Sequence, residues 1–160
     1  VERMSVVYAL GRNPCPSAVE KLVSLLETDD NAYVRRATAW SLANYDNQIV
    51  LKPLINALKN DVAAVRLWSS SSLAEIGNVS SKNAELAAEQ LLISLKIDNE
   101  SGVRSNCIWS LCRLFEKLNN TFQECFVDEC TKIALFDKEP SVMEEAKTAL
   151  DSMGMQGFYN

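Results

Sequence analysis

Apolar and small residues recur along this sequence in five segments that align without a gap. The segments cover residues 2–10, 34–42, 65–73, 103–111 and 142–150. Counting each from zero, position seven is always Ala or Ser and position eight is always Leu. Positions 0, 4, 7 and 8 fall within about 100° on a helical wheel, so each segment predicts a helix with one buried face. The segments start 32, 31, 38 and 39 residues apart, a spacing typical of helical-hairpin repeats.

A further apolar helix is expected before each later segment, for example around residues 19–26, 54–58 and 86–95. A short polar turn joins the two helices, with an aspartate four or five residues before position zero. Because a carboxylate favours the positive N-terminal end of a helix, this aspartate is expected to cap the second helix. The pattern predicts an all-α protein, a right-handed α-solenoid (α–α superhelix) of about four to five hairpin repeats. In this interpretation residues 1–154 form a single domain and residues 155–160 a C-terminal tail.

An arginine occupies position one in four of the five segments and is replaced in the last one by Met143. Position one lies at the edge of the buried face, beside the aspartates of the turns. We therefore interpret these arginines as a structural ladder that ties adjacent repeats together, and not as a phosphate site. The predicted ladder residues are Arg35, Arg66, Arg104, Asp30, Asp61 and Asp98.

The opposite face of the same helices predicts a binding groove. Positions two, three, six and ten point away from the core and carry all three tryptophans of the chain, interleaved with arginines. The predicted groove residues are Tyr8, Arg12, Arg36, Trp40, Leu67, Trp68, Trp109 and Arg113. Since aromatic residues with arginines are typical of protein-binding hot spots, we expect this concave groove to hold a protein partner. The alternative is that individual tryptophans pack sideways against the next repeat.

Composition excludes several kinds of chemistry. The 160 residues contain no histidine, which removes the usual general base and the commonest nitrogen ligand of metals. We predict no catalytic residue and no metal site. The net charge of −5 disfavours nucleic acid, and no apolar run is long enough to insert into a membrane.

The five cysteines are interpreted as small, half-buried thiols of a cytoplasmic protein. They show no CxxC spacing, at positions Cys15, Cys107, Cys112, Cys125 and Cys130. A redox or metal role for the last four is a weaker hypothesis, because cysteines five residues apart lie about 140° apart on a helix.

Two irregularities are expected. Longer spacings place inserted loops near residues 78–83 and 118–122. The first segment has no helix before it, which predicts either an upstream truncation or an open end. An open end of this kind can mediate a homo- or heterodimer.

The run from Asp30 to Leu42, with its aspartate turn, Val34-Arg35 and alanine-rich spacing, resembles a HEAT-like repeat of the phycobilisome-lyase type. Residues 61–68 and 103–107 are similar to cyanobacterial phycobilin lyases and phycobilisome-associated HEAT proteins. The resemblance covers residues 2–154 and departs from the repeat at Met143. It implies a scaffold or chaperone without a cofactor, whose partner is a phycobiliprotein subunit or another photosynthetic or assembly protein.

The same resemblance leaves an enzymatic alternative open, a bilin lyase subunit or chromophore carrier. In that hypothesis Trp40 and Trp109 stack on a linear tetrapyrrole while arginines pair with its propionates. Those arginines are Arg12, Arg36 and Arg113. Glu75 is then the proton donor, in place of the missing histidine.

Overall fold

The computed structural model describes residues 1–155 and 157, and all regular structure in that part of the chain is helical. The α-helices are α1 (Glu2–Arg12), α2 (Val19–Thr28), α3 (Ala32–Leu42), α4 (Leu51–Asn60), α5 (Ala63–Gly77), α6 (Ser81–Ile97), α7 (Ser101–Leu114), α8 (Asn120–Phe136) and α9 (Pro140–Ser152). Three single 3-10 turns lie between them: η1 (Pro16–Ala18), η2 (Gln48–Val50) and η3 (Phe115–Lys117).

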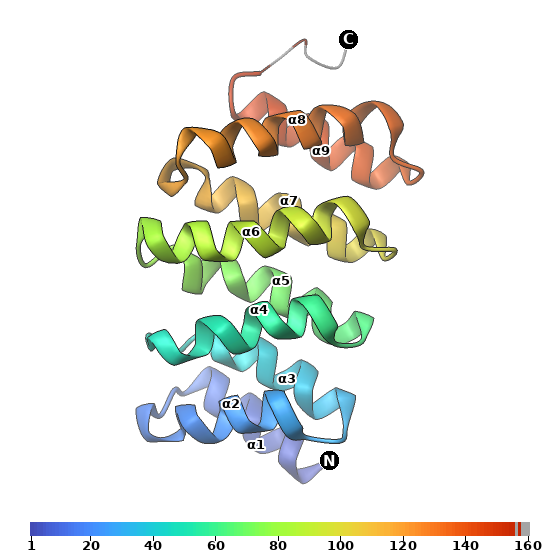
Figure 1. Ribbon diagram of the computed structural model, residues 1–160. Helices are drawn as coiled ribbons and strands as arrows, with labels where there is room; N and C mark the ends of the chain where they lie inside the picture. Colours follow the sequence, from blue (N-terminus) through green and yellow to red (C-terminus); the bar gives the residue numbers. More distant parts are fainter. Residues whose placement is uncertain (156, 158–160) are drawn as a thin grey trace.

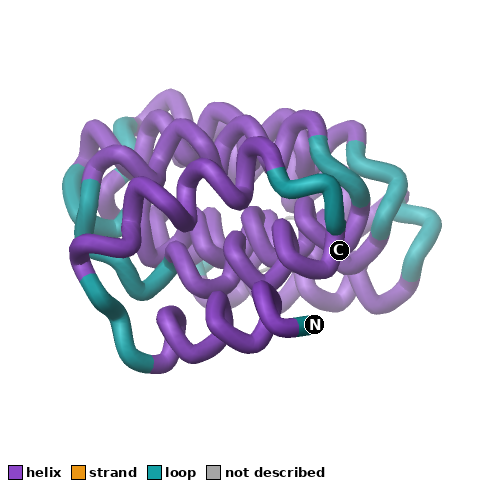
Figure 2. The backbone as a smooth tube through the Cα atoms, turned by 90° about the horizontal axis from the view of Figure 1, so that it is seen from below, coloured by secondary structure: helices purple, strands orange, loops and turns teal. Residues whose placement is uncertain are grey.

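The helices form two layers (Figures 1 and 2). Helix α1 is followed by four antiparallel hairpins, α2/α3, α4/α5, α6/α7 and α8/α9, stacked one on the next with the termini at opposite ends (Figure 1). We call α2, α4, α6 and α8 the first helices and α1, α3, α5, α7 and α9 the second helices. This arrangement confirms the predicted all-α solenoid.

The repeating apolar positions build the core between the layers. The valines at position zero of the last four segments are at most 2% exposed, and the leucines at position eight are completely buried. The residues are Val34, Val65, Val103 and Val142, with Leu42, Leu73, Leu111 and Leu150. Each hairpin therefore buries its own face and covers that of its neighbour, as a solenoid requires.

Small residues at position seven let neighbouring second helices approach closely. The Ser72 hydroxyl donates to the Ala39 carbonyl at 2.8 Å, and the Ser110 hydroxyl donates to the Ser70 carbonyl at 2.6 Å. Second helices contact one another more extensively than first helices do. The layer of second helices therefore forms the inner side of the stack.

The prediction of inserted loops near residues 78–83 and 118–122 is wrong. The extra residues lengthen helices instead: α6 and α8 have 17 residues each, whereas α2 and α4 have 10. Ser80 and Asn119 start the long helices, because their side chains accept hydrogen bonds from the main-chain N–H groups of Asn83 and Phe122.

Contrary to the prediction, the turn aspartates do not cap the second helices. Asp29, Asp61, Asp98 and Asp137 follow the last residue of each first helix. Each carboxylate accepts a main-chain N–H one or two residues later and thereby closes the turn. The four second helices that follow begin instead after Asn31, Val62, Glu100 and Glu139.

The C-terminal tail predicted at residues 155–160 lies largely outside the described residues. Met155 is described and packs against the core beyond the end of α9. Among the described helices, none is both long enough and apolar enough to cross a membrane.

Candidate binding surface

The predicted groove residues come from four successive second helices and lie in the same layer. Helix α1 carries Tyr8 and Arg12, α3 carries Arg36 and Trp40, α5 carries Leu67 and Trp68, and α7 carries Trp109 and Arg113. The structure divides this set into a part near α1 and α3 and a part near α5 and α7.

Near α1 the aromatic side chains pack against each other. The Tyr8 and Trp40 rings are tilted, with centroids 5.5 Å apart, and both residues are half-buried. The Trp40 ring also lies directly against Gly11, where no Cβ is present to hold it off. Trp40 thus packs sideways against the neighbouring helix and stabilises the stacking of α3 on α1.

Near α5 and α7 the tryptophans are open to solvent. Trp68 is 38% exposed and Trp109 is 44% exposed. Together with Leu67, Ser71 and Asn106 they line a shallow hollow of about 380 Å³. This hollow is mainly apolar at its walls and has two small polar side chains, which is the composition of a recognition pocket.

Asn106 was not among the predicted groove residues. Its amide nitrogen donates to the Leu67 carbonyl at 2.9 Å and links α7 to α5 beneath the hollow. It occupies position three of its segment, the position that also placed Trp68 on this face. The same helical geometry could therefore have identified it.

The two predicted groove arginines of α3 and α7, Arg36 and Arg113, stack on aromatic rings. The Arg113 guanidinium lies 5.1 Å from the centroid of the Trp109 ring and pairs with Glu75 at 3.0 Å. The Arg36 guanidinium lies 5.4 Å from the centroid of the Tyr33 ring. Arg113 thus lies beside the hollow, against the ring of Trp109, whereas Arg36 stacks on Tyr33 of its own helix outside it.

The predicted ladder arginines Arg35, Arg66 and Arg104 each pair with a carboxylate of the following repeat, and Arg3, which was not predicted as a ladder residue, does the same. The N···O distances are 2.9 Å for Arg35–Asp61, 2.8 Å for Arg66–Asp98, 2.8 Å for Arg104–Asp137 and 3.0 Å for Arg3–Asp29. Asp30 does not partner Arg35. Its side chain is 96% exposed and lies 3.6 Å from Arg3.

The same arginines also bind the turn of their own hairpin. Nη1 of Arg35, Arg66 and Arg104 donates to the carbonyl of Asp29, Asp61 and Asp98 respectively, at 2.8 to 3.0 Å. Hydrogen bonds that Arg35 donates to the Asp61 carboxylate raise the pKa of Arg35, and those that Arg66 donates to Asp98 raise the pKa of Arg66. Burial opposes ionisation of Asp137, but hydrogen bonds from Arg104 and the Glu139 N–H keep its pKa below the usual value.

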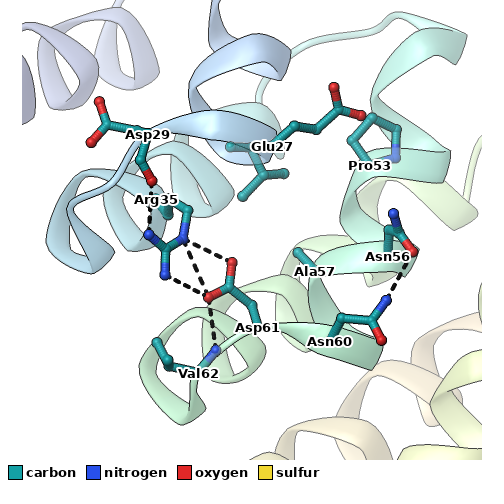
Figure 3. Close-up of a pocket in the computed structure, with 10 residues that line it drawn as sticks. Glu27, Asp29, Arg35, Pro53, Asn56, Ala57, Asn60, Asp61 and Val62 are labelled. Carbon is teal, nitrogen blue, oxygen red and sulfur yellow. Dashed lines mark hydrogen bonds and ion pairs between the residues drawn. The ribbon is translucent and has the colours of Figure 1, made fainter.

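A second hollow, of about 490 Å³, lies between α2 and α4 at the turn edge (Figure 3). Arg35 is bound by Asp61 and by the Asp29 carbonyl, and Asn60 donates to Asn56, whereas the Glu27 carboxylate points away from them toward Pro53 (Figure 3). Because most of these polar groups already have partners, the hollow offers little to a ligand.

The cysteines are all free thiols. Burial raises the pKa values of Cys107 and Cys130, and it raises that of Cys112 to about 11. Cys15 and Cys125 are exposed. Within the described residues there is no group of three or more cysteine, aspartate or glutamate side chains placed to hold a metal ion.

Comparison with known structures shows the same architecture in a designed protein. A designed armadillo repeat protein, YIII(Dq.V1)4CPAF, solved in complex with the peptide (KR)4, superposes with a TM-score of 0.63. The two chains are 17% identical, and the match covers 97% of this chain and 81% of the designed one. This likeness concerns the fold alone.

Comparison with curated proteins found no match. The family model for HEAT repeats matches residues 2–74 and 19–112, which is most of the chain. It describes HEAT repeats in general, so the phycobilisome-lyase type remains a prediction. With the stacked hairpins and the repeated Val-Arg segment, this match shows that the chain belongs to the HEAT repeat family.

Proposed function

We propose that the chain is a non-catalytic scaffold that holds a segment of another protein against its second helices, on the face that points away from the first helices and lies on the inner side of the stack. The observation that carries this proposal is the hollow between Trp68 and Trp109. Two large aromatic side chains on neighbouring helices stay partly exposed to water. Covering this apolar surface with a partner would therefore be favourable.

The polar groups around the hollow suit a polypeptide ligand. The amide nitrogen of Asn106 is used by Leu67, but its amide oxygen has no donor among the described residues. It is free to accept a main-chain N–H of a partner. The Arg113–Glu75 pair at the border offers both signs of charge to a partner side chain. The designed armadillo protein, which binds a peptide, supports the choice of ligand.

The test is affinity capture from the native lysate with a Trp68→Ala, Trp109→Ala double variant. We expect the wild-type chain to retain a partner that the double variant loses, while the helical circular dichroism is unchanged because neither ring is buried. A loss of about 2 kcal/mol or more is typical of a tryptophan hot spot and corresponds to at least about thirtyfold in affinity.

The matched control is Ile93→Ala, Ile97→Ala. These residues are 45% and 72% exposed but lie on α6, a first helix, so the variant removes apolar surface from the other layer. Retention of the partner by the tryptophan variant, or its loss from the control as well, would contradict the proposal.

A bilin is the second ligand that we propose for this surface, with a phycobiliprotein subunit as the corresponding partner. The arrangement that favours it is Arg113 stacked over Trp109, which combines an aromatic face with a cation suited to a propionate. The test is to add free phycocyanobilin and record the visible spectrum. Binding shifts and sharpens the absorbance, and an unchanged spectrum at about tenfold excess over a micromolar Kd would rule it out.

A further inference from the structure

The charged side chains of the second helices change sign along the stack. These helices follow one another as α1, α3, α5, α7 and α9 (Figure 1). Positions two, three, six, nine and ten of each segment form the face that points away from the first helices, which we call the inner face. The charged residues at these positions are Arg12 in α1, Arg36 in α3, Glu75 in α5, Arg113 in α7, and Glu144, Glu145 and Asp151 in α9. The inner face is therefore basic at α1 and α3 and acidic at α9.

The charges at the centre of the inner face are paired, whereas those at its basic end are not. Arg113 pairs with Glu75 at 3.0 Å, beside the hollow lined by the two tryptophans (the tryptophan hollow). Arg12 is exposed and Arg36 stacks on Tyr33, and neither forms an ion pair within the described residues. The buried Nε of Arg36 has no hydrogen-bond partner there either. A positive charge on α3 thus lacks a carboxylate.

The acidic end lies beside α7, the helix that carries Trp109. Helix α9 packs on α7, and Glu144 and Glu145 are both exposed. Lys147, one turn further along α9, pairs with Glu144 at 2.8 Å, but the Glu144 side chain stays 71% exposed. Burial is the main cause of the raised pKa of Cys112 on α7, and the nearby Glu145 carboxylate adds to it. Carboxylates therefore line the inner face one helix beyond Trp109.

The spacing of the helices determines where a ligand needs its own charges. Neighbouring helices pack about 8–10 Å apart, and an extended chain advances about 3.3 Å per residue. The tryptophan hollow lies between α5 and α7, so α3 and α9 are each roughly 12–15 Å from it. That distance corresponds to about four residues of extended chain. An extended chain also keeps main-chain N–H groups free for the amide oxygen of Asn106, whereas the interior of a helix does not.

We propose that the segment bound by the inner face is an extended polypeptide of mixed charge. A large apolar side chain occupies the tryptophan hollow, an acidic residue faces Arg36, and a basic residue faces Glu144 and Glu145. The two charged residues lie on opposite sides of the apolar one, each about four residues from it. This inference rests on the proposed function and adds the chemistry of the partner. A uniformly basic segment would be repelled at α3 and a uniformly acidic one at α9.

Three fluorescein-labelled peptides of about eleven residues test this charge pattern. Each has phenylalanine at its centre, and the two residues about four positions away are glutamate and lysine (mixed), two lysines (basic) or two glutamates (acidic). Fluorescence anisotropy in about 20 mM salt, where screening is weak, is expected to give a Kd of roughly 10–100 µM for the mixed peptide. The basic and acidic peptides are expected to bind about three- to tenfold more weakly, and about 0.5 M salt should remove the difference.

Reversing the charge of α9 is expected to change which peptide is preferred. Glu144→Lys, Glu145→Lys is expected to bind the acidic peptide about three- to tenfold more tightly than the mixed one, because both ends of the inner face are then basic. The matched control is Glu89→Lys, Glu124→Lys, which changes the net charge equally at exposed residues of the first helices α6 and α8. The control is expected to keep the wild-type preference for the mixed peptide.

The variant Trp68→Ala, Trp109→Ala separates this inference from the proposed function. If all three peptides bind the wild type equally and are lost from this variant, the mixed-charge inference is overturned and the scaffold function stands. If the charge preference survives in this variant, both are contradicted, because the ligand then lies away from the tryptophan hollow. Failure of every peptide to bind, or a preference that the α9 variant does not reverse, overturns the inference alone, and partner capture then decides the scaffold function.

Discussion

At the scale of single residues, Arg35, Arg66 and Arg104 each join two turns at once. Each guanidinium donates to a main-chain carbonyl of its own hairpin and to the carboxylate of the next one. A lysine could not do this, because a single ammonium lacks the planar fork that fits a carboxylate while a third nitrogen reaches elsewhere. The recurrence of arginine at position one is thus explained by geometry and not by charge alone.

The free energy that a rung contributes depends on its burial. The Arg104 side chain is 6% exposed, whereas that of Arg3 is 58% exposed. We expect Arg104→Met to lower the free energy of unfolding by about 3 kcal/mol, because Asp137 is left buried without its partner. Arg3→Met is expected to cost less than about 1 kcal/mol, since water already screens the exposed Arg3 guanidinium and Asp29 keeps the hydrogen bond from the Asn31 N–H.

Urea unfolding of the two variants at neutral pH measures this difference. Arg35→Met is expected to fall between them, because the Arg35 side chain is 17% exposed. Equal costs for Arg104→Met and Arg3→Met would show that burial does not set the strength of the rungs.

At the scale of helices, the contact between α1 and α3 depends on the absence of a side chain at Gly11. A Cβ there would collide with the Trp40 ring and lie 3.0 Å from the Ser41 hydroxyl. Gly11→Ala gains about 1 kcal/mol of helix propensity but is expected to lose about 1–3 kcal/mol through overpacking. Thermal unfolding measures the net loss, and a red shift of tryptophan fluorescence reports the displaced ring.

Gly102→Ala is the control for that substitution. Its Cβ would meet a methyl group at the end of the flexible Leu67 side chain, at 3.2 Å, and Gly102 is exposed. It is expected to leave stability unchanged or to raise it slightly through helix propensity. If Gly11→Ala behaves in the same way, Trp40 does not need the close approach.

Sequence reasoning predicted the second helices well because their pattern is redundant: five copies of one spacing define the buried face. It did not predict the lengths of the first helices. Residues 78–83 and 118–122 are mainly polar and are compatible with a loop, but Ser80 and Asn119 cap helices there. It also grouped Trp40 with Trp68, because a helical wheel gives direction and not the size of the neighbour. Only the packing shows that Gly11 leaves room for the Trp40 ring. Trp68 stays partly exposed instead.

At the scale of the whole molecule, stability is a sum over hairpins and their contacts, so it varies along the stack. Within the described residues, helix α5 is packed by α3, α4, α6 and α7, whereas α1 packs mainly on α3. Hydrogen exchange followed by mass spectrometry is expected to show faster exchange in α1 than in α5. Equal protection of the two helices would mean that the chain unfolds only as a unit.

The ladder also determines how the stack responds to tension. At one edge, consecutive hairpins are joined by the chain itself, through the loops that follow each second helix. At the other edge the guanidinium–carboxylate pairs join them in addition to the apolar packing, so a force along the axis acts on these non-covalent contacts before any covalent bond. Added salt or acid would make that edge more compliant. The hairpins would then separate along that edge, beginning at the Arg3–Asp29 pair, in which the arginine is exposed.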